Sequence, residues 1–140
     1  MTSMFTVRQA VRARLESQLF GQGITFHWSI PEFPTPPIMM VSPDFPSMNP
    51  EIGFSSVTAQ WNLIVTMIMD WVDEDAAQEQ LSTWLDPTGP VISALRSDDI
   101  DDVLSQMATD IRVTAAGDFD KTAMGGATVA FAQVRVQIKA

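Results

Sequence analysis

The first twenty residues carry apolar side chains at every fourth position, which is the spacing of a stripe along one face of an α-helix. The stripe consists of Val7, Val11, Leu15 and Leu19. We therefore predict an amphipathic helix over residues 4–20. Thr6 is placed to cap its N-terminus, and Gly21 and Gly23 are placed to end it.

Three arginines are predicted on the polar side of this helix: Arg8, Arg12 and Arg14. Arg12 precedes Glu16 by four residues, so the two side chains are spaced to form an ion pair.

Alternation of apolar and polar residues predicts β-strands in four further segments. These segments are residues 24–30, 55–70, 111–116 and 128–139. A short apolar run over residues 38–41 also has the length of a strand. Gly125 and Gly126 mark a turn before the last strand. In that strand, Val129 and Phe131 have the opposite parity to the apolar residues that follow, which indicates a bulge or a second buried patch.

Residues 42–53 are predicted to form a long loop, because three prolines interrupt the segment. Phe45 and Met48 lie between these prolines. Apolar side chains on a long loop bury little surface within their own domain. Phe45 and Met48 are therefore candidate contacts for a partner.

Two helices are predicted in the middle of the chain, over residues 73–85 and 90–95. The first opens with acidic residues, which suit a helix N-terminus, and the second begins at Pro90. The order is helix, strands, helix pair, strands, with no repeated βαβ unit. This order predicts an α+β fold, a mainly antiparallel sheet with helices packed on one face. The length of 140 residues suits one domain, and no linker divides residues 1–140.

Composition narrows the functional classes. With 17 acidic and 8 basic residues the net charge is −9, which argues against a protein that binds the phosphate backbone of nucleic acids. There is no cysteine and one histidine, so Cys-ligated zinc and multi-histidine metal sites are excluded. No apolar run reaches the roughly 18 residues that cross a bilayer. We expect no cofactor, no metal and no membrane partner.

The sequence offers little catalytic chemistry. His27 lies within a predicted strand, and no nucleophile motif, phosphate-binding glycine loop or zinc-protease motif accompanies it, which favours a structural histidine. Four aspartates, Asp98, Asp99, Asp101 and Asp102, form an acidic turn. They lack the spacing, the central glycine and the final glutamate of a calcium loop. No catalytic residue is predicted, and the chain is not expected to be an enzyme.

Charge is distributed unevenly along the chain. Residues 70–110 contain eleven acids and a single base, Arg96. One interpretation is a solvated helical face. The other is head-to-tail association, in which the acidic side of one subunit meets arginines of the next. The candidate arginines are Arg8, Arg12, Arg14 and Arg135.

The order of elements and several short strings resemble the tail terminator (tail completion) proteins of long-tailed, siphovirus-type actinobacteriophages. The strings are VRQAVRARL at residues 7–15, WNLIVTM at 61–67 running into the acidic helix at 73–85, PVISAL at 90–95, and GGA at 125–127 followed by FAQVRVQI at 131–138. The resemblance spans nearly the whole chain. It includes no catalytic signature.

This resemblance implies a structural virion protein of the tail neck, assembled in the host cytoplasm. Such proteins form a ring, a homohexamer, on the completed tail tube. The ring stops tube polymerisation and provides the tail-side surface for head–tail joining. Its partners would be other copies of itself, the tail tube protein and a head–tail connector or stopper protein. DNA would pass through the lumen without specific binding.

An acidic lumen would repel the DNA that slides through it. The candidate lumen-facing residues are Asp98, Asp99, Asp101 and Asp102. Two other functions remain open. The nearer alternative is a head–tail connector or stopper protein of the neck, which would bind a portal-side adaptor in place of the tube protein. The more distant alternative is a small acidic ligand-binding or hydrolytic domain that uses the aromatic strand around His27.

Overall fold

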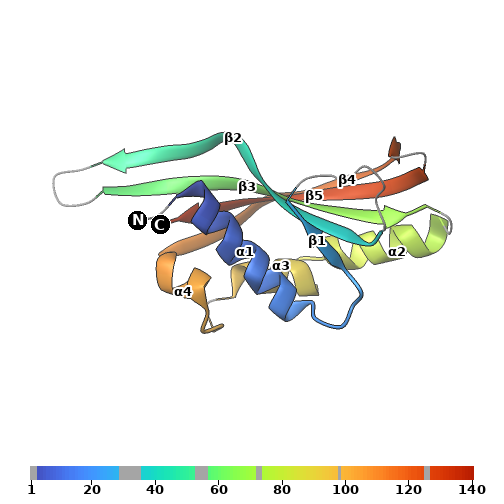
Figure 1. The fold of residues 1–140 in the computed structure, drawn as a ribbon, viewed down its shortest axis with the longest axis horizontal. Coiled ribbons are helices and arrows are strands. Elements are labelled where there is room, and N and C mark those ends of the chain that lie inside the picture. Colours follow the sequence, from blue (N-terminus) through green and yellow to red (C-terminus); the bar gives the residue numbers. More distant parts are fainter. Residues whose placement is uncertain (1–2, 29–35, 53–56, 72–73, 98, 125–126) are drawn as a thin grey trace.

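The computed structural model describes residues 3–28, 36–52, 57–71, 74–97, 99–124 and 127–140. Its helices are α1 (Met4–Gln18), α2 (Glu74–Leu85), α3 (Pro90–Arg96) and α4 (Val103–Met107). Its strands are β1 (Thr25–His27), β2 (Ile38–Ile52), β3 (Val57–Asp70), β4 (Asp110–Met124) and β5 (Ala127–Lys139). The strands form one sheet in the order β1-β2-β3-β5-β4, in which β1 is parallel to β2 and the other neighbours are antiparallel. The predicted α+β fold is confirmed (Figure 1).

The main hydrophobic core lies between the helices and one face of the sheet. Figure 1 shows the helices on one side of the strands. Alternate residues of the central strands, such as Leu63 and Val65 of β3 and Val134 of β5, share one buried cluster with Leu15 of α1 and Trp84 of α2. The alternation that predicted these strands therefore places every second side chain against the helices.

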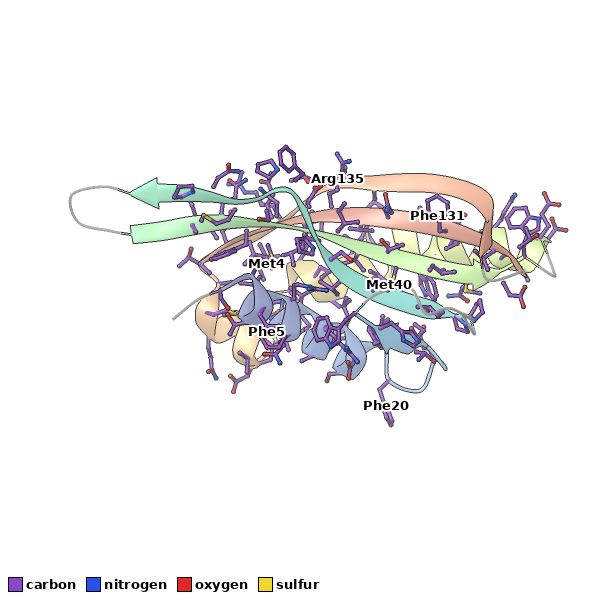
Figure 2. All side chains as sticks on the ribbon, turned by 45° about the horizontal axis from the view of Figure 1, so that its top comes forward. Met4, Phe5, Phe20, Met40, Phe131 and Arg135 are labelled. Carbon is purple, nitrogen blue, oxygen red and sulfur yellow. The ribbon has the colours of Figure 1, made fainter. Side chains whose placement is uncertain are left out.

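A second, smaller buried cluster lies on the opposite face of the sheet. It consists of Ile38, Met40, Ile68 and Val129, with Phe131 partly buried against it. Figure 2 shows Met40 and Phe131 on neighbouring parts of this face. The change of parity in the last strand thus marks a second buried patch, as one of the two predictions stated.

Helix α1 begins at Met4, as predicted, but its N-cap differs from the predicted one. Ser3 is the N-cap, and its hydroxyl accepts a hydrogen bond from the Thr6 amide at 3.2 Å. The Thr6 hydroxyl in turn accepts from the Ser3 amide at 2.8 Å. The prediction that Thr6 is the cap is wrong, because Thr6 is the third residue of a reciprocal capping box. The helix ends before Gly21 and Gly23, whose φ angles are 87° and 72°, as glycines after a helix permit.

The predicted loop over residues 42–53 is mostly strand, and this prediction is wrong. Strand β2 pairs with β3 as far as Ile52, although the step from Pro43 to Met48 faces only the two-residue step from Leu63 to Trp61. Prolines suit this strand for two reasons. In the described part of the chain β1 pairs only with residues 38–40 of β2, so the rest of β2 is a sheet edge, and the bulge absorbs the irregular residues.

Other boundaries differ in both directions. Strand β1 is limited to Thr25–His27 within the described residues, shorter than the predicted 24–30, and residues 29–30 lie outside them. Strand β4 reaches Met124, well beyond the predicted end at residue 116. Its register against β5 shifts twice, between Val113 and Ala115 and between Gly117 and Asp120. These irregularities interrupt the alternation of apolar and polar residues, while the two strands remain paired. The predicted turn at residues 125–126 lies outside the described residues.

One polar side chain lies inside the helical layer. Arg14 of α1 is 1% exposed, so the prediction that it lies on the polar side of the helix is wrong. Its Nε and Nη2 donate to the two carboxylate oxygens of Asp102 at 2.7 and 2.8 Å. Nη2 also donates to Ser105 Oγ at 2.7 Å, and Nη1 donates to the carbonyl oxygens of Ala94 and Ser97 at 3.3 and 2.9 Å. These contacts use all five guanidinium donors.

The Arg14–Asp102 pair joins three helices. Ala94 belongs to α3, and Asp102 is the N-cap of α4, where its carboxylate accepts from the Ser105 amide at 2.9 Å. The hydrogen bonds from Arg14 lower the pKa of Asp102 from 3.8 to about 2, against the opposing effect of burial. Asp102 is therefore a structural residue, and its proposed place among lumen-facing acids is withdrawn.

The first prediction concerns the stability that this pair provides. Asp102→Asn keeps a helix-capping side chain but leaves the buried guanidinium without a counter-charge, so we expect a loss of roughly 3 kcal/mol in the free energy of unfolding. Asp101→Asn is the matched control, since Asp101 is exposed and its neutralisation should change stability by less than about 0.5 kcal/mol. Urea unfolding measures both. Equal losses in the two variants would contradict the structural role of Asp102.

The second prediction is a pH dependence. Because the pKa of Asp102 is lowered in the folded state, its contribution is complete above the ordinary value of 3.8 and is lost as the pH falls toward about 2. The difference in unfolding free energy between the wild type and Asp102→Asn should therefore shrink as the solution is acidified through this range. Urea unfolding in a series of acidic buffers measures this difference. A constant difference would show that folding does not lower the pKa of Asp102.

Candidate interaction surfaces

The described part of the chain offers no assembled catalytic or metal site. No group of three or more His, Asp or Glu side chains that could hold a metal ion occurs among these residues. His27 is half-buried in β1, and no hydrogen bond or ion pair of its side chain is found within this part of the structure. No helix there is long and apolar enough to cross a membrane.

One hollow among the described residues lies at the turn between α1 and β1. It has a volume of about 490 Å³ and is lined mostly by apolar residues, including Leu19, Phe20, Ile24 and Phe26. The titratable group in its lining is Glu16, which forms an ion pair with Arg12. Figure 2 shows Phe20 pointing away from the molecule. This hollow brings no acid, base and nucleophile together.

The bulge of β2 is held from the face of the sheet opposite the helices. Asn62 of β3 is 7% exposed, and its side-chain nitrogen donates to the Pro46 carbonyl oxygen at 2.7 Å. On the same face, Arg135 of β5 lies 3.7 Å from a carboxylate oxygen of Asp44. Figure 2 shows Arg135 on the side of the sheet away from the helices. Phe45, between Asp44 and Pro46, is 95% exposed.

Phe45 is therefore an apolar side chain on an anchored segment. Its amide donates to Oδ1 of Asp44 at 2.8 Å, which further fixes the backbone beside it. An exposed aromatic side chain on a fixed backbone loses less conformational entropy on binding than one on a mobile loop, which suits an interface anchor. The sequence correctly marked Phe45 as exposed, although for the wrong reason, since the segment is a bulge in a strand.

Met48 does not share the surroundings of Phe45. It lies opposite Trp61 in the pairing of β2 with β3, and Trp61 packs against the core on the helix side. Met48 is 40% exposed. The indole nitrogen of Trp61 is buried without a hydrogen-bond partner among the described residues. Of the two candidate contacts, only Phe45 thus lies within the bulge. Met48 lies where regular pairing with β3 resumes.

A second surface, the α1 platform, consists of Phe5, Arg8, Arg12 and Trp28. The guanidinium carbons of Arg8 and Arg12 lie 4.9 and 4.5 Å from the centroid of the Trp28 ring, which is the range of cation–π contacts. The Phe5 ring lies 6.2 Å from the same ring. Phe5 and Trp28 are 58% and 38% exposed. Aromatic rings and two cations are therefore presented together.

Hydrogen bonds to the backbone hold the arginines of the α1 platform in position. Arg8 donates to the carbonyl oxygens of Val41 and Trp28 at 3.0 and 3.2 Å. Arg12 donates to the Phe26 carbonyl oxygen at 3.3 Å and pairs with Glu16 at 2.6 Å. The predicted Arg12–Glu16 pair is confirmed. Sequence reasoning missed Phe5 and Trp28 as parts of this surface. The sequence showed two arginines one helical turn apart and an aromatic strand after the helix, but not that the two would meet.

Two of the four aspartates proposed for the lumen lie on the described surface. Asp99 and Asp101 are exposed, Asp102 is paired with Arg14, and Asp98 lies outside the described residues. Other exposed acids lie on α2, namely Glu74, Asp75 and Glu79. The acidic segment therefore presents its charge on two separate elements.

No protein-family model matches the sequence, and no curated protein matches it at a significant level. The resemblance to tail terminator proteins therefore rests on the order of elements and on the short strings in the sequence. The anchored bulge, the α1 platform and the acidic helix α2 are the candidate interaction surfaces of the described residues.

The third prediction concerns the bulge. Asn62→Ala removes the side-chain donor to Pro46, so amide hydrogen exchange should accelerate in residues 43–48 and stability should fall by about 1 kcal/mol. Gln78→Ala is the control, because Gln78 is exposed on α2, on the other side of the sheet from Asn62. Hydrogen exchange read by mass spectrometry follows both variants. Unchanged exchange in the bulge of Asn62→Ala would show that Asn62 does not anchor it.

Proposed function

We propose that this protein is a structural component of a phage tail neck, a tail terminator. Copies of the chain form a closed ring, a homohexamer, on the completed tail tube. The ring stops further polymerisation of the tube and provides the tail-side surface that joins the tail to the head. DNA passes through the ring without specific binding.

The observation that carries this proposal is Phe45, exposed at 95% on a bulge that Asn62 and the Asp44–Arg135 pair hold in place. A small α+β subunit without assembled catalytic groups in its described part, yet with a fixed apolar anchor, suits a protein that acts by contact. The resemblance of the sequence strings to those of tail terminators supports the choice of partner. We assign the Phe45 contact to the tube protein or to the neighbouring subunit.

The charge of the chain supports a passive relation to DNA. A net charge of −9 disfavours general binding of the chain to the phosphates of DNA. Asp99 and Asp101 are the described candidates for the surface that lines the channel, because they are exposed and no ion pair of theirs is found in the described part. Arg14 takes no part in partner binding, since its guanidinium is buried and fully hydrogen-bonded.

The fourth prediction tests this function with growing tubes. Purified tail tube protein is polymerised in the presence of the wild type or of Phe45→Ser, and tube lengths are measured by negative-stain imaging. The wild type should leave short tubes with a ring at one end. Phe45→Ser should remain folded and allow long, uncapped tubes, because the exposed anchor is lost.

Phe20→Ser is the matched control. Phe20 is also nearly fully exposed, at 90%, but lies at the turn after α1, away from the bulge. It should stop tube growth as the wild type does. Wild-type protein that neither binds tubes nor shortens them would overturn the assignment as a terminator. Binding to a portal-side adaptor instead would identify a connector or stopper protein.

A further inference from the structure

We propose that the α1 platform binds the acidic helix α2 of a second copy of this chain. This inference rests on the proposed ring and specifies the contact between its subunits. The contact is head-to-tail, because the two surfaces are different parts of the molecule. Repetition of such a contact closes into a ring when the rotation between subunits divides a full turn.

The α1 platform carries positive charge that the described part of the chain does not balance. Arg8 donates only to the carbonyl oxygens of Val41 and Trp28, and no carboxylate pairs with it among these residues. Arg12 shares its charge with Glu16, whose side chain is 47% exposed. Both guanidiniums are held against Trp28, so they are positioned before any partner arrives. Guanidinium groups with exposed aromatic rings beside them favour carboxylates carried on an amphipathic surface.

Helix α2 carries the complementary charge. Its buried residues, Ala77, Leu81 and Trp84, face the core, and Glu74, Asp75 and Glu79 face outward. The helix contains no basic residue, and these three acids form no ion pair within the described part of the structure. Asp75 and Glu79 are four residues apart, a spacing at which like charges weaken a helix. A cationic partner would remove this repulsion.

The two surfaces are not in contact within one subunit. Helix α3 packs against both α1 and α2, and Figure 1 shows α2 near one end of the sheet while the start of α1 lies toward the other. Each subunit therefore presents a cationic aromatic surface and an acidic surface at separate places. Charge complementarity of this kind selects the partner and its orientation.

Charge reversal tests the contact in the full-length protein. The double variant Asp75→Lys/Glu79→Lys and the variant Arg8→Glu should each raise the dissociation constant of the ring at least about tenfold, because each places like charges together. An equimolar mixture of the two variants should recover rings, since each reversed surface then meets its complement. Because subunits must alternate, the mixture should contain only even-numbered rings. Native mass spectrometry gives the composition.

Arg112→Glu is the matched control. Arg112 is exposed on β4 and pairs with Asp110. The substitution Arg112→Glu therefore changes the net charge by the same amount as Arg8→Glu but leaves the α1 platform unchanged. It should leave the rings intact. If Arg8→Glu fails to fold, Arg8→Gln replaces it, and it should still weaken the ring.

The outcomes separate this inference from the proposed function. If the wild type forms rings and both charge-reversal variants form them equally well, the α1–α2 contact is overturned and the terminator function stands. The same conclusion follows if the variants lose their rings and the mixture does not recover them. Wild-type protein that forms no ring, alone or on tail tubes, overturns both. Loss of rings in the Arg112→Glu control at the same level shows that net charge, not this contact, controls assembly, and this also overturns the inference.

Discussion

The buried guanidinium of Arg14 determines how the helices are arranged beneath the sheet. It lies in the middle of α1 and connects the end of α3 with the start of α4 through Asp102. A buried charge is costly unless every donor finds an acceptor, and here all five do so. An apolar side chain at this position could pack in several orientations, whereas the two parallel hydrogen bonds between the Arg14 guanidinium and the Asp102 carboxylate require one relative orientation. The pair therefore fixes the position of α1 together with the buried apolar residues of the helix, such as Val7, Val11 and Leu15.

The interaction surfaces depend on that arrangement. Arg8 and Arg12 lie one and two turns from the start of α1, and their hydrogen bonds to Val41, Trp28 and Phe26 tie the outer side of the helix to β1 and β2. The bulge of β2 is fixed separately, from the other face of the sheet. The subunit is therefore a rigid support for an apolar anchor and a charged platform. Rigid supports favour association, because little flexibility is lost when the contact forms.

Periodicity was sufficient to predict the α+β class, helices α1, α2 and α3 and the central strands, since both β3 and β5 bury every second side chain. The five-residue helix α4 was not predicted. Periodicity failed where the environment of a residue depends on segments far away in the sequence. Arg14 lies seven residues after Val7, on the same face of the helix as the apolar stripe, but its charge suggested the polar side. Its burial depends on Asp102, which is 88 residues away. The prolines of β2 suggested a loop, although a bulged edge strand accommodates them. The α1 platform also required the fold, because Trp28 meets the arginines only when β1 lies beside α1.

The central claim is that copies of this chain associate into a closed ring that binds the end of a tail tube. The mass of the wild-type protein by native mass spectrometry, alone and mixed with tail tube protein, tests it most directly. The account predicts a discrete ring of subunits, formed alone or on the tube, with a mass that corresponds to six copies. A protein that stays monomeric in both samples, up to the highest concentration reached, would contradict the account.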